Sequence, residues 1–133
     1  PRADVLADIR KLGGRFDTDQ SGNVTAIDLS FTAVSPAQLQ QLTQFAELTD
    51  LDLTGTSVSD DGITVICSLA NLRSLKLKGT LVSDTGFRKL SVLSNLLLLD
   101  ASRTAVTDEG LSLASAWPML TYLSLNSTAA STR

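Results

Sequence analysis

Acidic side chains are the groups in this sequence that could most readily do chemistry. Asp28, Asp50 and Asp52 could act as acids or bases if one of them were desolvated. The chain of 133 residues has no histidine, which excludes imidazole bases and metal sites with histidine ligands. Its single cysteine, Cys67, cannot form a disulfide within the chain and is expected to be a small buried thiol. Since there is also no glycine-rich phosphate loop or nucleophile elbow, the sequence argues against an enzyme.

A second set of oxygen atoms lies in the segment DTDQSGNVTAID, residues 17–28, which resembles the calcium loop of EF-hand proteins. In that interpretation Gly22 makes the bend, and the ligands come from Asp17, Asp19, Ser21, the Asn23 carbonyl and Asp28. Against it, Val24 and Ile27 belong to a repeating strand pattern, and Asp28 replaces a bidentate glutamate. We therefore expect a polar hairpin turn, with calcium binding as the alternative and no other cofactor.

Charge and hydropathy exclude two classes of partner. The formal net charge is −3, too small to indicate a nucleic-acid surface. The longest apolar run, residues 96–99, is far shorter than the ~20 residues of a membrane span. We therefore expect neither nucleic-acid binding nor a transmembrane segment.

An apolar residue recurs every 24 positions, which indicates five repeated units. Numbered from this residue, position one is occupied by Val24, Leu48, Leu72, Leu96 and Leu120. Positions four and six are apolar as well, and position nine is always threonine: Thr32, Thr56, Thr80, Thr104 and Thr128. We expect each threonine to satisfy backbone groups at a turn.

Each unit combines the signals of a short strand, a turn and a helix. Hydroxyl residues that would serve as N-caps precede the helices at Ser35, Ser59, Ser83 and Thr107. Apolar residues then recur at helical spacing, for example at Ile63, Ile66 and Leu69. Because one unit is too small to bury its own apolar stripe, the units must stack. The sequence predicts a solenoid with parallel strands in register.

The runs LTDLDLTGTSVSDDGI, LRSLKLKGTLVSDTGF and LLLLDASRTAVTDEGL resemble the leucine-rich repeat family, in its bacterial 24-residue variety with the pattern T-x-V-T-D-x-G-L. The resemblance covers residues 24–128. It implies an α/β horseshoe with a parallel concave sheet, convex helices and an N-terminal helical cap. The first unit departs from the pattern at Phe31 and at Pro36-Ala37-Gln38, which replaces D-x-G, and the fourth departs from it at Ala101 and Arg103, at core and turn positions. The V-S/T-D-x-G segment also resembles repeats of F-box proteins, although no F-box is visible.

The two ends of the stack differ. Residues 1–23 are expected to form a cap, with a helix over residues 3–12 ended by Gly13-Gly14 and a hairpin strand at Arg15-Phe16. The repeats span residues 24–47, 48–71, 72–95, 96–119 and, in part, 120–133. No capping helix follows the fifth unit, so we expect either a longer parent protein or a homodimer through residues 111–130.

The concave face changes character along the predicted stack. It is acidic at its start, basic in the middle and apolar at Leu98 and Tyr122, both expected to be exposed. Lys76 between Asp52 and Asp100 is expected to form a cross-strand salt ladder. The residues predicted to contact a partner are Asp28, Asp50, Asp52, Arg73, Lys76, Lys78, Leu98, Asp100 and Tyr122.

The resemblance implies a non-catalytic scaffold that binds a protein or peptide on the concave face. The calcium-stabilised module is one alternative, and an F-box-like, substrate-recruiting subunit of a larger assembly is another. Five strands at ~4.8 Å spacing give a face of roughly 300 Å², whereas a standard interface takes ~800 Å² from each partner. We therefore expect loops, further repeats or self-association to enlarge the contact.

Overall fold

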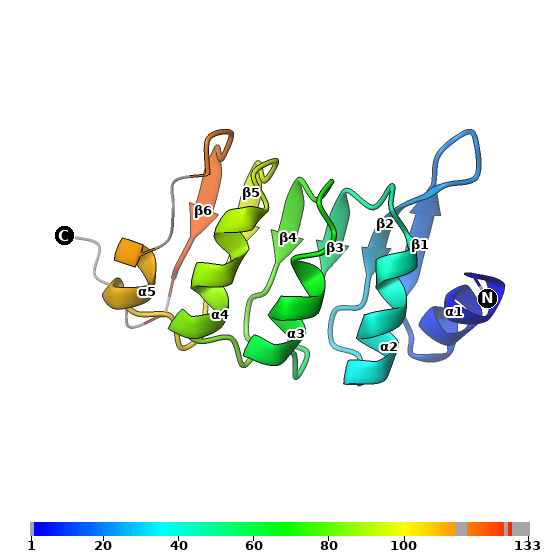
Figure 1. The fold of residues 1–133 in the computed structure, drawn as a ribbon. Coiled ribbons are helices and arrows are strands. Elements are labelled where there is room, and N and C mark those ends of the chain that lie inside the picture. Colours follow the sequence, from blue (N-terminus) through cyan, green and yellow to red (C-terminus); the bar gives the residue numbers. More distant parts are fainter. Residues whose placement is uncertain (1, 114–116, 127, 129–133) are drawn as a thin grey trace.

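The computed structural model describes residues 2–113, 117–126 and 128, which form one sheet backed by a row of short helices (Figure 1). The sheet contains six strands in sequence order. They are β1 (Arg15–Thr18), β2 (Val24–Asp28), β3 (Asp50–Asp52), β4 (Ser74–Lys76), β5 (Leu98–Asp100) and β6 (Tyr122–Ser124). The helices are α1 (Arg2–Lys11), α2 (Pro36–Gln41), α3 (Asp60–Ile66), α4 (Asp84–Lys89) and α5 (Asp108–Leu113), with 3-10 turns η1 (Leu42–Gln44) and η2 (Leu90–Val92).

The strands from β2 to β6 are parallel and keep the register that the repeat predicts. Ala26 lies beside Asp50, which lies beside Ser74, and the next partners are Leu98 and Tyr122. Each step is 24 residues, because every unit contributes the same length of turn and helix before the chain returns to the sheet. Equivalent positions therefore form rows across the sheet.

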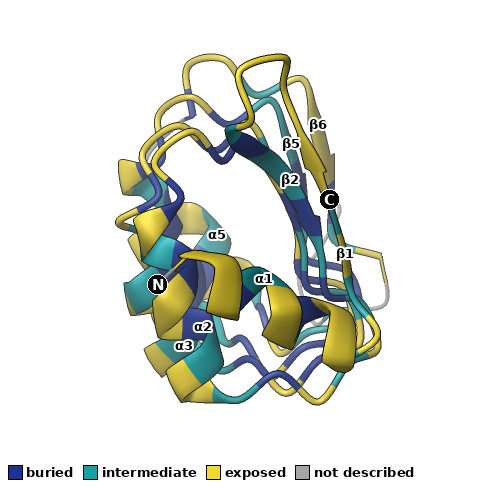
Figure 2. Cartoon of the chain, turned by 90° about the vertical axis from the view of Figure 1, so that its right-hand side faces the viewer, coloured by how far each residue is buried: buried dark blue, intermediate teal, exposed yellow. Residues whose placement is uncertain are grey.

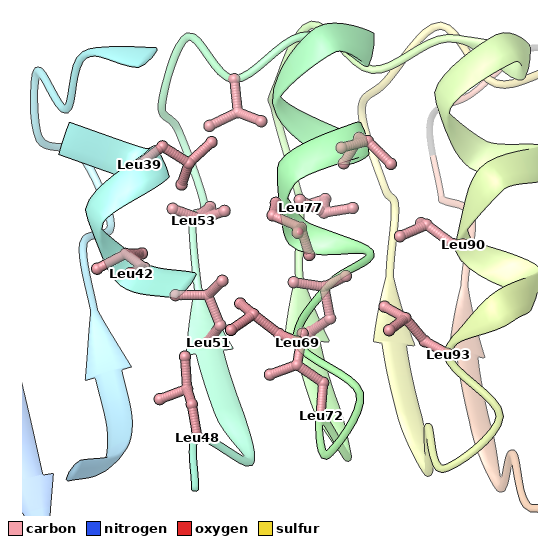
Figure 3. Close-up of a cluster of buried hydrophobic side chains, with 14 of the residues drawn as sticks. Leu39, Leu42, Leu48, Leu51, Leu53, Leu69, Leu72, Leu77, Leu90 and Leu93 are labelled. Carbon is pink, nitrogen blue, oxygen red and sulfur yellow. The ribbon is translucent and has the colours of Figure 1, made fainter. Parts of the chain in front are cut away.

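The apolar core lies between the sheet and the helices (Figure 2). Positions one, four and six of the repeats point into it, and their leucines stack from one unit to the next (Figure 3). Ile63, Ile66 and Leu69 cover them from the helix side, as the helical spacing predicts. Since adjacent units bury the same positions against each other, stability comes from contacts between neighbouring repeats.

The turn after each strand repeats the same hydrogen bond. The Thr56 hydroxyl donates to the Leu53 carbonyl at 2.8 Å, and the Thr80 hydroxyl donates to the Leu77 carbonyl at 2.7 Å. The other three threonines donate likewise, to the carbonyls of Leu29, Ala101 and Leu125. The predicted structural role of the threonines is confirmed.

A left-handed backbone conformation recurs one residue before each of the first four threonines. Gly55 and Gly79 both have φ of 71°, and the departing residues Phe31 and Arg103 adopt nearly the same conformation, with φ of 58° and 55°. All four backbone amides donate to a carbonyl of the following repeat. The turn geometry is therefore kept at Phe31 and Arg103 despite their side chains.

The helix starts are only partly capped as predicted. Ser35 forms a capping box with Gln38, and the Thr107 hydroxyl accepts a weak bond from the Glu109 amide at 3.3 Å. Ser59 and Ser83 make no such bond within their own helices, so that part of the prediction is wrong. The reason is that the cap for α4 comes from the preceding repeat.

Asp60 supplies this cap from the first turn of α3. Its carboxylate accepts bonds from the Ser83 amide at 2.8 Å and from the Ser83 hydroxyl. Asp84 does the same for Thr107. Burial raises the pKa of Asp84, but the bonds from Thr107 and Gly110 and the charge of Arg88 lower it further, so its pKa lies below the usual 3.8.

The glycines of the D-x-G pattern make room for these carboxylates. A methyl group on Gly86 would lie 2.3 Å from Asp60 Oδ1, and one on Gly110 would lie 2.2 Å from Asp84 Oδ1. The pattern is therefore a capping device shared between repeats. It is missing between the first two units, where Pro36 stands in place of the aspartate.

The N-terminal helix α1 lies across the start of the stack, between the sheet and the other helices (Figure 2). Val5 and Ile9 are buried against the core. After Gly13, with φ of 94°, β1 runs antiparallel to β2 and pairs Arg15 with Asp28. The expected helix and hairpin strand are present, the strand being two residues longer than predicted.

At the C-terminal end Trp117 is buried, and its indole nitrogen donates to the Leu90 carbonyl at 2.9 Å. Its ring meets the Phe87 ring edge to face at 5.5 Å. Beyond it Leu123 is 37% exposed, whereas Leu120 and Leu125 are half-buried. The structure describes most of the predicted dimer segment, residues 111–130. Residues 114–116, 127, 129 and 130 of it lie outside the described part of the chain.

Cys67 is half-buried on the helix side, where its thiol donates to the Lys89 carbonyl at 3.3 Å. Burial raises the pKa of this thiol, which opposes formation of the reactive thiolate. Within the described residues, no helix is long and apolar enough to cross a membrane.

Candidate interaction surface

The open sheet face is the side of the sheet that points away from the helices. One row across it consists of Asp17, Ala26, Asp50, Ser74, Leu98 and Tyr122, and the next consists of Arg15, Asp28, Asp52, Lys76, Asp100 and Ser124. The sequence predicted these rows from β2 onward. The structure adds Arg15 and Asp17, because β1 extends the sheet by one antiparallel strand.

The aspartates of the second row bond to their own chain. Oδ1 of Asp52 accepts a bond from the Thr54 amide at 3.0 Å, and Oδ1 of Asp100 accepts one from the Ser102 amide at 2.9 Å. Lys76 forms no ion pair with either, so the predicted salt ladder is wrong for this part of the chain. A local turn bond fixes each carboxylate without immobilising the long lysine side chain, which stays exposed.

A hollow of about 420 Å³ lies on the open sheet face over strands β1 to β4. Four of the predicted residues, Asp28, Asp50, Asp52 and Lys76, line it. Of the seven other residues that line it, four belong to the rows of the open sheet face and were not among the residues predicted to contact a partner: Arg15, Asp17, Ala26 and Ser74. Arg15 and Asp17 could have been found from the sequence by extending the pairing of the hairpin to its first strand, β1. Four aspartates and two cations leave a net charge of −2 on the lining.

Asp28 is a carboxylate of this hollow that accepts several hydrogen bonds. It accepts a bond from Arg15 at 3.1 Å and two from Ser30, at 2.9 Å from the amide and 2.7 Å from the hydroxyl. Partial burial raises its pKa, but these bonds and the Arg15 charge lower it further, so the pKa of Asp28 lies below its usual value. Asp28 is therefore ionised at neutral pH and is not suited to act as a general acid.

The remaining predicted residues lie away from the hollow. Arg73 lines a second depression below the strands, with Glu47 and Met119. Lys78 is exposed two residues after the end of β4. Tyr122 is 51% exposed as predicted, but Leu98 is only half-buried rather than exposed. Ser102 and Ser124 are buried and bonded to each other at 2.6 Å.

The segment resembling a calcium loop is a hairpin between β1 and β2. Asp19 Oδ1 accepts bonds from the Ser21 and Asn23 amides at 2.9 Å, and Asp19 Oδ2 accepts one from the Asn23 side chain. The Asn23 amide bond is the main cause that lowers the pKa of Asp19. Asp28 lies on β2 and pairs with Arg15, and no group of three or more potential metal ligands occurs in the described part. This arrangement is that of a polar turn.

Phe31 is an exposed aromatic residue in the turn after β2, one of the strands that form the floor of the hollow. Its side chain is 79% exposed and contacts Gly55. The Phe31 amide donates to the Thr54 carbonyl at 2.8 Å, and the amide of the same Thr54 bonds Asp52. Only one signal in the sequence marked this position, namely the absence of the glycine that the next two repeats have there.

Solved structures similar to this chain agree on its fold. An internalin C2 from Listeria monocytogenes superposes with a TM-score of 0.63 at 18% identity, covering 95% of this chain and 65% of that one. An internalin inlF from the same species has a TM-score of 0.57 at 19% identity, covering 87% of this chain and 40% of that one. The fold is a leucine-rich repeat solenoid.

A plant structure has the same fold. The leucine-rich repeat ectodomain of the receptor kinase GASSHO1/SCHENGEN3 from Arabidopsis thaliana, solved in complex with CASPARIAN STRIP INTEGRITY FACTOR 2, has a TM-score of 0.58 at 20% identity. It covers 86% of this chain and 14% of that one. This chain therefore spans less than two thirds of each of these three structures. No family model and no curated protein matches the sequence.

Proposed function

We propose that this leucine-rich repeat chain is a non-catalytic module that binds a protein or peptide on its open sheet face. The observation that carries the proposal is the open sheet face itself, a row-by-row array of side chains that changes from acidic at β1–β3 to apolar at β6. A rigid sheet presents such side chains at fixed spacing, which suits recognition of an extended surface. The plant ectodomain, solved in complex with a factor, shows that this fold can hold a partner.

The carboxylates on this face support binding rather than catalysis. Each of Asp28, Asp52 and Asp100 accepts a backbone amide two residues further along the chain. A general acid at neutral pH needs a raised pKa, and the pKa of Asp28 is lowered. Asp28 therefore acts as a fixed negative charge.

Tyr122 is the proposed anchor at the apolar end, with Leu98 beside it in the neighbouring strand. Tyrosine is among the residues enriched at the energetic centres of protein interfaces. Arg73, Lys76 and Lys78 would orient a partner by charge. We expect the double variant Leu98→Ala, Tyr122→Ala to weaken binding by about tenfold or more, equivalent to about 1.4 kcal/mol.

The test of the binding face is site-specific photocrosslinking. A photoreactive amino acid at Ser74 lies on the open sheet face, and one at the exposed Thr85 of α4 is the matched control on the helix side. Ser74 should capture a partner protein whose affinity then falls in the Leu98→Ala, Tyr122→Ala variant. Capture from Thr85 alone, or unchanged affinity in the double variant, would refute the proposal.

A homodimer through the C-terminal end is a second proposal, supported by the apolar exposure around β6. Met119 and Tyr122 are each 51% exposed, and Leu123 is 37% exposed. Among the described residues β6 is an edge strand that pairs only with β5, and edge strands favour pairing with a second chain. A polar capping helix appended after Asn126 should abolish self-association in sedimentation experiments. A chain that is monomeric at high concentration without the added helix would contradict the dimer.

A further inference from the structure

The acidic end of the open sheet face points to one kind of partner. We infer that the hollow over β1–β4, together with the exposed ring of Phe31, takes a segment of a partner protein in which an arginine is next to an apolar side chain. This inference rests on the proposed function and specifies the chemistry of the partner at one end of the surface.

The charge of the hollow selects a cation. Asp28 is neutralised by Arg15, which leaves Asp17, Asp50 and Asp52 against Lys76 alone. Asp52 uses Oδ1 for the Thr54 amide and Asp50 uses Oδ1 for the Thr49 hydroxyl, so Oδ2 of each forms no bond to the described residues. Asp50 and Asp52 lie on one strand and point to the same face, because they are two residues apart.

Two neighbouring carboxylates favour arginine over lysine. A guanidinium presents five donors in a planar fork and can bond both oxygens of one carboxylate or bridge two. An ammonium is a compact charge that loses more hydration when it enters a partly enclosed site. The volume of about 420 Å³ also accommodates a long side chain.

Phe31 adds an apolar contact at the rim. The Phe31 amide donates to the Thr54 carbonyl and the Thr54 amide donates to Asp52, so one residue links the Phe31 backbone to Asp52. Its exposed face can stack on a guanidinium or cover an apolar neighbour of the arginine. A phenylalanine that is 79% exposed contributes little to the core, and its left-handed backbone is unfavourable for a bulky residue. A contact with a partner accounts for an aromatic ring in this place.

The test selects peptides that bind the full chain from a random displayed library. The selected peptides are then synthesised, and their affinities are measured by fluorescence anisotropy. We expect the selected peptides to contain arginine beside an apolar residue, and citrulline in place of the arginine should weaken binding at least tenfold. The Asp50→Asn, Asp52→Asn variant should lose at least tenfold as well, since asparagine keeps the Oδ1 acceptor but replaces the charged Oδ2 by an amide donor. The matched control is Asp8→Asn, Asp61→Asn, which makes the same charge change at exposed positions on α1 and α3 and should bind normally.

Phe31→Gly separates a binding role from a structural one. Glycine suits the left-handed turn, so the melting temperature should stay the same or rise while peptide affinity falls several-fold. A fall in melting temperature with unchanged affinity would assign Phe31 to the fold and overturn its part in the site.

The remaining outcomes distinguish the inference from the proposed function. Selected peptides without a basic residue, insensitive to Asp50→Asn, Asp52→Asn but sensitive to Tyr122→Ala, would overturn the inference and leave binding on the open sheet face standing. Selected peptides that bind the Asp50→Asn, Asp52→Asn variant and the Tyr122→Ala variant as tightly as the native chain would overturn both the inference and the proposed function.

Discussion

Replacing Gly86 by alanine should uncouple two neighbouring repeats. The new methyl group would lie 2.3 Å from Asp60 Oδ1, so the carboxylate would have to move by about 1 Å to reach ordinary contact. That movement breaks or lengthens the bonds from the Ser83 amide and hydroxyl, which cap α4. Hydrogen bonds to a charged group contribute about 1.5–3 kcal/mol each. Alanine recovers about 1 kcal/mol of helix propensity, and water replaces part of the loss because Asp60 is only half-buried.

The expected net destabilisation is therefore about 2–3 kcal/mol, measured as a lower denaturant midpoint with an unchanged slope. The control is Gly62→Ala, where the methyl group would meet only the side chains of Val58 at 2.9 Å and Leu39 at 3.0 Å. These side chains can shift, so the free energy of unfolding should change by less than about 1 kcal/mol.

A double-mutant cycle tests the cause. Asp60→Ala removes the carboxylate that the methyl displaces but keeps the Asp60 Cα, 3.2 Å from the methyl, so adding Gly86→Ala in that background should change the free energy of unfolding by less than about 1 kcal/mol. If Gly86→Ala destabilises as strongly without Asp60 as with it, the shared cap is not the reason for the glycine, and the reasoning fails.

Two further predictions concern acid and calcium. The folded-state pKa of Asp84 is lowered, so its contribution to stability is complete above the usual value of 3.8 and is lost as the pH falls through the lower folded value. Asp84→Asn should therefore be less stable than the native chain at neutral pH, and the gap between their melting temperatures should close below about pH 3.8; a constant gap would contradict this linkage. Millimolar calcium should leave the melting temperature unchanged, because the Asp19 oxygens bond Ser21 and Asn23 and Asp28 pairs with Arg15. A rise of several degrees that Asp19→Ala removes would show that the hairpin binds the ion.

The sequence alone was sufficient for the architecture. A 24-residue period with leucine at fixed positions allows few arrangements, since each strand and helix must bury its apolar side against a copy of itself. The period therefore predicted the register of β2 to β6 and the threonine bonds at the turns. The division of the chain at residue 24 and the bacterial variety of the repeat stay predictions, as does the F-box-like alternative.

Tertiary structure decided every feature that depends on which polar partner is nearest. Ser83 is a sound N-cap by local rules, yet it bonds Asp60 across the repeat boundary, because the stack brings that carboxylate closer than any group of its own helix. Lys76 and Asp52 are neighbours in the register, but a backbone amide two residues away holds the carboxylate instead. The hollow likewise depends on the position of β1, and the contact between Phe31 and Gly55 depends on how the adjacent turns stack. A repeating pattern specifies where the backbone goes, whereas the choice among competing hydrogen bonds is settled by differences of about an ångström that only the folded chain contains.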